Sequence, residues 1–267
     1  MAIAEDYLVN SIGVQIGSLE VKLAANSLEI DAAQALRYKV FYEEMRANPS
    51  LQVKNSKRDV DPFDTYFDHL LVIDHDLEGK ISDKVVGTYR LNRGIKSGKG
   101  SPFYTSGEYN IDKLINFKGN ILELGRSCVR SDYRNGKTMQ LLWRSIAGYV
   151  LFYDIKIMFG CASFPGIDKK IHSACLSYLY SEHLAPLEIR PFALKDRYIE
   201  MKSEIYRNDS KISIRKTMPP LIKGYLRLGA YIGDGAVIDY DFNTLDVCIV
   251  LPTKKVANRY MSHYDRY

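Results

Sequence analysis

The chain has 267 residues, 46% of them hydrophobic, and a net charge of +5 at neutral pH. This length favours one large domain with extensions over two full domains, and it allows a substantial core. Because the basic residues are spread along the chain, we expect no nucleic-acid partner, although acidic proteins and anionic lipid headgroups remain suitable partners.

The four cysteines show neither CxxC pairing nor the regular spacing of a disulfide scaffold. This pattern indicates reduced thiols in a cytoplasmic protein and argues against a zinc site. The first twenty-one residues contain no Lys or Arg, and the most apolar run, YVLFYDIKIMFGCASF, is interrupted by Asp154 and Lys156. We therefore expect neither a signal peptide nor a membrane span.

Residues 27–46, SLEIDAAQALRYKVFYEEMR, have the period of an amphipathic helix. Asp31 and Gln34 resemble a capping pair near its start. Arg37 lies one turn before Phe41, beside the apolar stripe, where a charge is unexpected. A functional arginine is one interpretation, and an arginine that reaches from the edge of the stripe to solvent is the other. The predicted apolar stripe consists of Ile30, Ala33, Leu36, Val40 and Phe41.

An acidic loop follows at residues 57–74, KRDVDPFDTYFDHLLVID, where Asp59, Asp61, Asp64 and Asp68 precede or begin a strand that starts near Phe67. The stretch KVVGTYRLNR predicts a second strand, joined to the first by a hairpin connection. Residues 94–119 are rich in Gly and Ser, so we expect mostly loop there.

The next strand, ILELGRSCV, carries Glu123 and Arg126 with Gly125 between them. In a regular strand these two charges would point to opposite faces. A bulge at Gly125 would place them on one face and free a backbone amide, and that amide could stabilise an oxyanion during acyl transfer. The alternative is a surface strand with a simple ion pair.

Basic residues surround the turn after this strand, with Arg130, Arg134 and Lys137 around Asn135-Gly136. The residues that follow have helical period, so the amides of the helix start face the same turn. This arrangement suits phosphate. Later in the chain, KIMFGCASF predicts a buried strand, DKKIHSACLSYLYSEHL a helix, and GAVIDY and LDVCIVLP a final strand pair, which gives an α+β order.

The strand, bulge, basic turn and helix resemble the acyl-donor motif of the GNAT superfamily, which cradles the coenzyme A pyrophosphate with Arg/Gln-x-x-Gly-x-Gly/Ala. Here the stretch after Arg134 is NGKTM, with a single displaced glycine. The resemblance with this departure implies a donor with fewer phosphates. Acyl carrier protein, whose phosphopantetheine arm carries one phosphodiester, fits this expectation, and no other cofactor is expected.

Six stretches in order resemble the L-ornithine N-alpha-acyltransferases of ornithine-lipid synthesis, a family once labelled hemolysin-like. They are ALRYKVFYEE, RDVDPFDTYFDHLLV, VVGTYRL, ELGRSCVRSDYR, FGCASFPG and PPLIKGYLRLGA. The resemblance implies a single GNAT-like domain over residues 1–267, with a mostly antiparallel twisted sheet flanked by helices. Its core would span about 21–185 and a C-terminal extension about 186–267. The acyl-homoserine lactone synthases are similar in the core but lack a counterpart of PPLIKGYLRLGA, and they rank second.

The resemblance implies transfer of a 3-hydroxyacyl group from acyl carrier protein to L-ornithine, by direct attack of the amine, close to the inner face of the membrane that receives the product. Glu123 would be the base and Arg126 its catalytic neighbour. The expected substrate-binding residues are Arg37, Phe41, Asp61, Asp64 and Arg90. The expected donor-binding residues are Ser127, Cys128, Val129, Arg130, Arg134, Gly136 and Lys137.

Other interpretations of single features remain open. Cys128 as an acyl-carrying nucleophile lacks an activating histidine nearby in the sequence, so packing is favoured. His69 is expected to be structural. The acidic loop lacks the glycine and spacing of a calcium loop, so we expect no metal. Finally, the basic and apolar stretch SKISIRKTMPPLIKGYLRLGAYIG allows a non-catalytic protein of the membrane surface.

Overall fold

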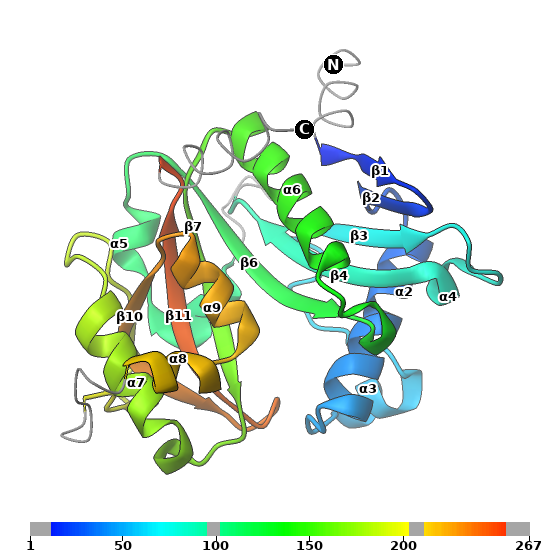
Figure 1. Ribbon diagram of the computed structural model, residues 1–267. Coiled ribbons are helices and arrows are strands. Elements are labelled where there is room, and N and C mark those ends of the chain that lie inside the picture. Colours follow the sequence, from blue (N-terminus) through cyan, green and yellow to red (C-terminus); the bar gives the residue numbers. More distant parts are fainter. Residues whose placement is uncertain (1–11, 95–101, 203–210, 255–267) are drawn as a thin grey trace. The chain divides into compact units, whose positions relative to one another are not determined.

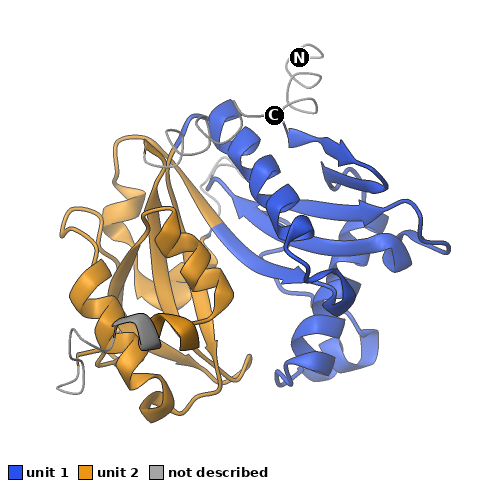
Figure 2. Ribbon diagram, in the orientation of Figure 1, with its two compact units in different colours: residues 1–102, 124–155 blue, residues 103–123, 156–267 orange. Residues whose placement is uncertain are grey.

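A computed structural model describes residues 12–94, 102–202 and 211–254 (Figure 1). The chain divides into two compact units, each built from two separate stretches (Figure 2). The first unit holds residues 1–102 and 124–155, and the second holds residues 103–123 and 156–267. Strand β6 (Asn120–Val129) contributes to both, since the division falls after Glu123. The single domain inferred from sequence stays a prediction.

The sheet of the first unit has the order β1-β2-β3-β4-β6, and its first four strands are antiparallel neighbours. The predicted hairpin is confirmed. One of its strands lies at the end of the acidic loop, and the other lies in the stretch KVVGTYRLNR. The connection contains a short helix, α4 (Ile81–Lys84). The four strands are β1 (Val14–Ile16), β2 (Leu19–Leu23), β3 (Asp68–Asp74) and β4 (Val85–Asn92).

Helices cover both faces of this sheet. Helix α2 (Ser27–Tyr38) packs on the face that carries Leu71 and Ile73. Helix α6 (Lys137–Phe152) covers the other face, where Thr138 lies against the backbone of Gly87. Because both faces are covered, β3 and β4 read in the sequence as nearly continuous apolar runs. Figure 1 shows the two helices on either side of these strands.

The start of α2 differs from the sequence prediction. Its N-cap is Asn26, whose side chain accepts a hydrogen bond from the Glu29 amide at 3.1 Å. The predicted capping pair is therefore wrong: Asp31 instead forms an ion pair with Arg58, and Gln34 turns toward the acidic loop. The end of the helix also differs, because residues 39–44 form a π-helix (Lys39–Glu44). Short π-helical segments within longer helices are frequent at functional sites.

The second unit has the strand order β7-β11-β10-β8-β5, with β9 paired to β10. Neighbouring strands of this unit run antiparallel, except β8 with β10. Its core lies between aromatic side chains such as Phe103, Tyr109 and Phe159 and the apolar residues of β10 and β11. The strands are β5 (Tyr109–Asn110), β7 (Ile155–Pro165), β8 (Phe192–Ala193), β9 (Tyr198–Ile199), β10 (Tyr231–Asp239) and β11 (Thr244–Pro252).

The predicted α+β fold, with a mostly antiparallel sheet flanked by helices, is confirmed. The described part of the predicted loop at residues 94–119 instead contains short elements, and β1 and β2 were not predicted. The remaining helices are α3 (Leu51–Ser56), a 3-10 helix (Tyr104–Gly107), α5 (Asp112–Ile115), a 3-10 helix (Ser131–Tyr133), α7 (Lys169–His183), α8 (Lys211–Thr217) and α9 (Pro220–Arg227).

Helix α9 bears on the membrane-surface interpretation of the sequence. Its apolar side chains Ile222 and Tyr225 are buried, so this helix does not offer them to a lipid surface. In addition, every helix within residues 12–94, 102–202 and 211–254 is too short or too polar to cross a bilayer.

Candidate active site

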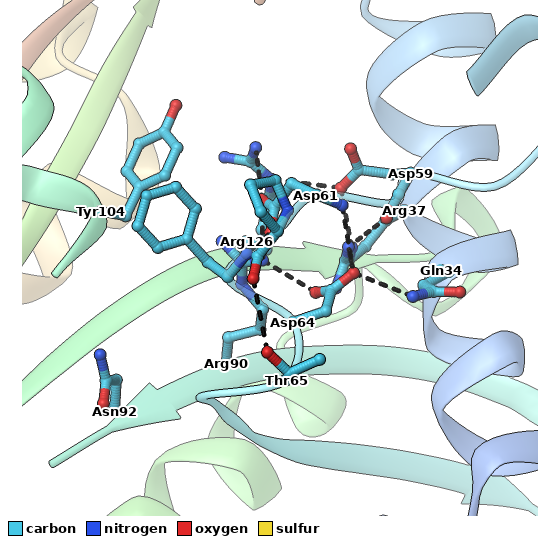
Figure 3. A network of polar contacts seen from close by, with 12 residues as sticks. Gln34, Arg37, Asp59, Asp61, Asp64, Thr65, Arg90, Asn92, Tyr104 and Arg126 are labelled. Atoms are coloured by element: carbon cyan, nitrogen blue, oxygen red, sulfur yellow. Dashed lines mark hydrogen bonds and ion pairs between the residues drawn. The ribbon is translucent and has the colours of Figure 1, made fainter. Parts of the chain in front are cut away.

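Three arginines and three aspartates of the first unit form one network (Figure 3). The acidic side chains come from the loop before β3, and each arginine comes from a different element: Arg37 from α2, Arg90 from β4 and Arg126 from β6. The family resemblance implied that Asp61 and Asp64 of this loop bind the substrate. The structure shows that the chain supplies three cations itself.

Arg37 is fully buried and holds two of the aspartates. Its Nε donates to Asp59 Oδ2 at 2.7 Å, and its Nη1 and Nη2 donate to the two carboxylate oxygens of Asp64 at 2.9 and 3.0 Å. A further bond runs from Nη2 to the main-chain carbonyl of Asp59. This forked geometry suits arginine, and a lysine could not reproduce it. The arginine therefore fixes the acidic loop to α2, and the solvent-directed alternative is wrong.

Arg90 and Arg126 complete the network around Asp61. Arg90 Nη1 donates to both oxygens of Asp61, at 2.7 and 2.8 Å, and to Asp64 at 2.8 Å. Arg126 makes longer contacts, to Asp59 at 3.2 Å and to Asp61 at 3.1 Å. The Asp61 and Arg126 side chains are 14% and 11% exposed, whereas Arg37 and Arg90 are at most 1% exposed. Asp61 and Arg126 thus form the accessible edge of the network.

The network keeps its charges despite burial. Burial opposes ionisation of Asp64, but Arg37 and Arg90 outweigh it and lower the pKa of this carboxyl well below its ordinary value. The pKa of Asp59 is lowered in the same way, since Arg126, Arg37 and Arg90 overcome the effect of burial. Burial lowers the pKa of Arg90, and the neighbouring Arg126 and Arg37 add to the shift. With three charges of each sign, the network is balanced.

Neighbouring polar groups support the same loop. Gln34 donates to Asp64 at 2.9 Å, and the Tyr42 hydroxyl in the π-helix donates to Asp59 at 3.0 Å. His69 Nε2 lies 3.0 Å from the Asp64 carbonyl. Burial lowers the pKa of His69 to about 4, so the ring is neutral at neutral pH, as expected for a structural histidine. Sequence reasoning missed the parts played by Asp59 and Tyr42, because neither pairing is local.

Phe41 and Asp68 have contacts in other parts of the first unit. Phe41 is half-buried in the π-helix and packs against the apolar cluster between α2 and the sheet. Asp68 accepts a hydrogen bond from the Tyr149 hydroxyl at 2.6 Å. The fourth aspartate of the loop thus has a separate partner.

Strand β6 contains one residue with an unusual backbone conformation, next to the position of the predicted bulge. Arg126 has a φ of 51°, in the left-handed region that a non-glycine residue seldom occupies inside a strand. Gly125 is not among the residues with positive φ, and a Cβ added to it would meet nothing within 4 Å. A bulge residue can have a negative φ, so the bulge assigned to Gly125 stays a prediction. The strain lies on the arginine that closes the charge network.

Glu123 belongs to the second unit, where it is buried. Its carboxylate accepts hydrogen bonds from the amides of Tyr104 and Thr105, at 3.0 and 2.6 Å, and from the Thr105 hydroxyl at 2.6 Å. These donors hold the carboxylate in one orientation and tie the start of the 3-10 helix to β6. The catalytic assignment of Glu123 stays a prediction.

The expected donor-binding strand end is mostly buried. Cys128 packs in the apolar cluster beside α2, and burial raises its pKa to about 12, so the thiol is a poor nucleophile. Packing, which the sequence favoured, accounts for it. Val129 is buried as well, and the Ser127 hydroxyl is shielded from solvent with no hydrogen-bond partner in the part of the chain that the structure describes.

The basic turn leads into α6 as predicted. Gly136, with a φ of 90°, is the N-cap and supplies no side-chain cap, and Lys137 begins the helix. Arg130 forms an ion pair with Asp132 at 2.8 Å, and Arg134 forms one with Glu44 at 2.5 Å. Among the described residues, none forms an ion pair with Lys137, which is exposed. Arg130 and Arg134 would have to give up an acidic partner to bind phosphate. Lys137 has no such partner among the described residues.

Comparison with known proteins identifies the family. The family described as acetyltransferase (GNAT) domain matches residues 36–144. The chain is 44% identical over 252 residues to L-ornithine N(alpha)-acyltransferase of Agrobacterium fabrum, covering 94% of this chain and 86% of the relative. It is 45% identical over 255 residues to the protein of the same name from Brucella abortus, covering 94% and 90%. This chain belongs to the L-ornithine N(alpha)-acyltransferase family.

As a member of this family with a GNAT domain, the chain is an acyltransferase, and the predicted family and enzyme class are confirmed. Among solved structures, the coenzyme A-dependent acyl-homoserine lactone synthase BjaI has a TM-score of 0.47 at 14% identity, over 86% of this chain and 79% of that chain. The acyl-homoserine lactone synthase LasI has a TM-score of 0.45 at 12% identity, over 87% and 89%.

Proposed function

We propose that this chain transfers a 3-hydroxyacyl group from acyl carrier protein to the α-amine of L-ornithine and so forms lyso-ornithine lipid. The observation that carries this proposal is the family membership, because relatives at 38–45% identity over 93–94% of the chain bear the name L-ornithine N(alpha)-acyltransferase. The site in the first unit supports it chemically.

The acceptor would bind at the accessible edge formed by Asp61 and Arg126. Ornithine carries two amines and one carboxylate, so it needs an acid and an arginine. The Asp61–Arg126 contact is at 3.1 Å, longer than the contacts deeper in the network. Ornithine would replace the Asp61–Arg126 ion pair with two ion pairs of its own. One of its amines would contact Asp61, and its carboxylate would contact Arg126. Arg37, Asp59, Asp64 and Arg90 would position those two side chains.

The donor would bind where β6 ends and α6 begins. The start of α6, where Asn135 accepts from the Lys137 amide at 3.1 Å, is suited through its remaining amides and the Lys137 side chain to the single phosphodiester of phosphopantetheine. Arg130 and Arg134, which are paired with surface acids, would contribute to the contact with an acidic carrier protein. Ser127, Cys128 and Val129 would line the strand beside the arm.

The reaction would be direct aminolysis. The ornithine amine, having lost a proton to Glu123 directly or through water, attacks the thioester carbonyl and forms the new C–N bond. A backbone amide freed at the left-handed residue of β6 would stabilise the oxyanion. The C–S bond then breaks, and the phosphopantetheine thiolate leaves and takes up a proton.

Mass spectrometry of the products tests this proposal. The purified chain is incubated with 3-hydroxyacyl-acyl carrier protein and an equimolar mixture of ornithine, lysine, homoserine and norvaline. We expect N-acylornithine as the main product. With single acceptors, Nδ-acetylornithine should be acylated at a reduced rate, whereas Nα-acetylornithine should be inert.

Three outcomes would contradict the proposal. Acylation of Nα-acetylornithine would place the reaction on the distal amine. Release of thiol without any acylated amino acid would indicate hydrolysis of the thioester in place of transfer. Binding to anionic liposomes without release of thiol would favour the membrane-surface alternative. The same chain carrying Arg126→Ala is the matched control for background hydrolysis of the thioester.

A further inference from the structure

Three carboxylates that the proposed acyl transfer does not use gather in the second unit. Glu108 precedes β5, Asp239 ends β10, and Asp246 lies in β11. All three are buried, at 3%, 8% and 5% exposure. One oxygen from each lies within 4.8 Å of the oxygens of the other two. Burial of three acids at such distances is unfavourable unless a proton or a cation compensates them.

The strand register explains why the two aspartates meet. Asp239 pairs with Thr244, and Asp246 pairs with Val237 two residues back along β10. Because side chains alternate along a strand, Asp239, Thr244 and Asp246 share one face of the sheet. The Asp239 carboxylate is oriented by the amides of Asp241 and Phe242, at 2.8 and 2.9 Å.

The backbone around the cluster is also fixed. The Tyr109 hydroxyl donates to the main-chain carbonyl of Asp246 at 3.1 Å. The Leu194 amide donates to the carbonyl of Glu108 at 2.9 Å. The main chain at Glu108 and Asp246 is therefore held in place by contacts that do not use the charges of these side chains.

Two polar atoms at the cluster have no hydrogen-bond partner among the described residues. One is Glu108 Oε2, which is shielded from solvent. The Thr244 hydroxyl, on the same sheet face as both aspartates, is likewise buried without a partner. A carboxylate oxygen and a hydroxyl without partners, both beside one acidic cluster, are best explained by a bound ion that is coordinated by oxygen atoms.

We propose that Glu108, Asp239 and Asp246 bind one hard divalent cation, with Ca²⁺ as the best-fitting ion. Three carboxylates and a hydroxyl supply oxygen donors, which suit Ca²⁺ or Mg²⁺. Ca²⁺ binds oxygen at about 2.4 Å, so two of its ligands lie at most about 4.8 Å apart. The spacing of the three oxygens is therefore compatible with their binding one Ca²⁺.

The cluster consists of acidic side chains, so a divalent cation would reduce the repulsion among them. Sequence analysis expected no metal and missed this cluster, because Glu108 is separated from the two aspartates by more than a hundred residues and meets them only through the sheet.

Direct binding tests the proposal on the full chain. Protein treated with EDTA and desalted is dialysed against radiolabelled CaCl₂, and separately titrated with MgCl₂ by calorimetry. We expect one ion per chain with saturation below about 1 mM for the better ion. At a hundredfold excess over Kd, the melting temperature should rise by about 5 °C. No binding of either ion up to about 10 mM, beyond the weakest range of protein calcium sites, would overturn the proposal.

Two variants and one control locate the site. Glu108→Gln and Asp246→Asn should each weaken binding at least tenfold, with unchanged far-ultraviolet circular dichroism. Asp241→Asn removes an exposed acid from the turn next to Asp239 and should bind the ion as the unmodified chain does. Equal affinity in Glu108→Gln and the unmodified chain would overturn the site. If neither variant folds, the dialysis of the unmodified chain still decides.

Discussion

Arg37 and Asp64 face each other through two parallel hydrogen bonds, at 2.9 and 3.0 Å, and both side chains are buried. Asp64 also accepts from Arg90 and Gln34. A carboxylate with this many internal donors primarily holds the loop to α2 and β4. The acidic loop is therefore a structural device as well as a candidate binding site, and its aspartates should respond differently to mutation.

Replacing Asp64 by Asn should destabilise the protein strongly. The change keeps the size of the side chain but leaves two buried arginines with too few negative partners, which costs about 3–5 kcal/mol. We expect a fall in the melting temperature of roughly 6–15 °C, measured by circular dichroism. Asp132→Asn, at the exposed pair with Arg130, is the control and should change the melting temperature little.

The pH dependence should follow the same residue. Because folding lowers the pKa of Asp64, its stabilisation is complete above the unfolded value of about 4 and is lost as the pH falls below it. The melting temperature of the unmodified chain should thus drop more steeply below about pH 4 than that of Asp64→Asn. Parallel curves for the two proteins would show that the pair does not contribute.

Replacing Asp61 by Asn should act on the acceptor. Asp61 lies at the accessible edge, so loss of its charge should raise the KM for ornithine about tenfold or more, as for a charge-assisted bond of about 1.5–3 kcal/mol, with the donor KM unchanged. Norvaline should be a poor acceptor, and its disadvantage should shrink in this variant if Asp61 binds the distal amine. Asp68→Asn, in the same loop but bonded to Tyr149, is the matched control. A normal KM in Asp61→Asn would remove this residue from the site.

The sequence shows which charged residues are available for this site, but it does not show which of them pair. Apolar periodicity and turn residues are local signals, and they placed β3, β4, β6, α6 and α7 correctly. The partners of Arg37, Asp31 and Gln34 lie 22 to 30 residues away, and only packing brings them together. The π-helix at residues 39–44 likewise has no local signature, since it depends on how the end of α2 packs. Non-local charge pairing therefore required the structure.

Substitutions at Gly125 test where the strain in β6 lies. The sequence alone predicts that Gly125→Val is harmful. With a φ outside the left-handed region and open space at the Cβ position, Gly125→Ala should fold normally and be as stable as the unmodified chain or slightly more so. Arg126→Val, which puts a β-branched residue at φ 51°, should melt at a markedly lower temperature than Arg126→Gly. Equal melting of these last two variants would mean that residue 126 is not strained.

Lys137 should matter for the donor more than its two basic neighbours do. It is exposed at the start of α6, while Arg130 and Arg134 are paired with Asp132 and Glu44. We expect Lys137→Ala to raise the KM for acyl-acyl carrier protein several-fold and to reduce the sensitivity of that KM to salt. Lys169→Ala changes the first residue of α7, another exposed helix start, and should have no effect. Equal efficiency of acyl coenzyme A and acyl-acyl carrier protein at matched chain length would contradict the choice of donor.

Glu123→Gln tests the proposed base, but the contacts of Glu123 complicate its interpretation. The carboxylate accepts three hydrogen bonds, so an amide NH₂ at this position would face an N–H or O–H donor and destabilise the protein by about 1–3 kcal/mol. Rates must therefore be compared well below the melting temperature of the variant. Thr105→Ala, which removes one donor and keeps the carboxylate, is the control for the structural part and should stay within about threefold of the unmodified rate.

If Glu123 accepts the proton, Glu123→Gln should be about a hundredfold slower at neutral pH. The deficit should shrink as the pH rises above about 8, because the α-amine then loses its proton without help. A purely structural role would lower the rate by the same factor at every pH. A folded Glu123→Gln protein that retains more than a third of the activity at neutral pH would show that another group, or water alone, takes the proton.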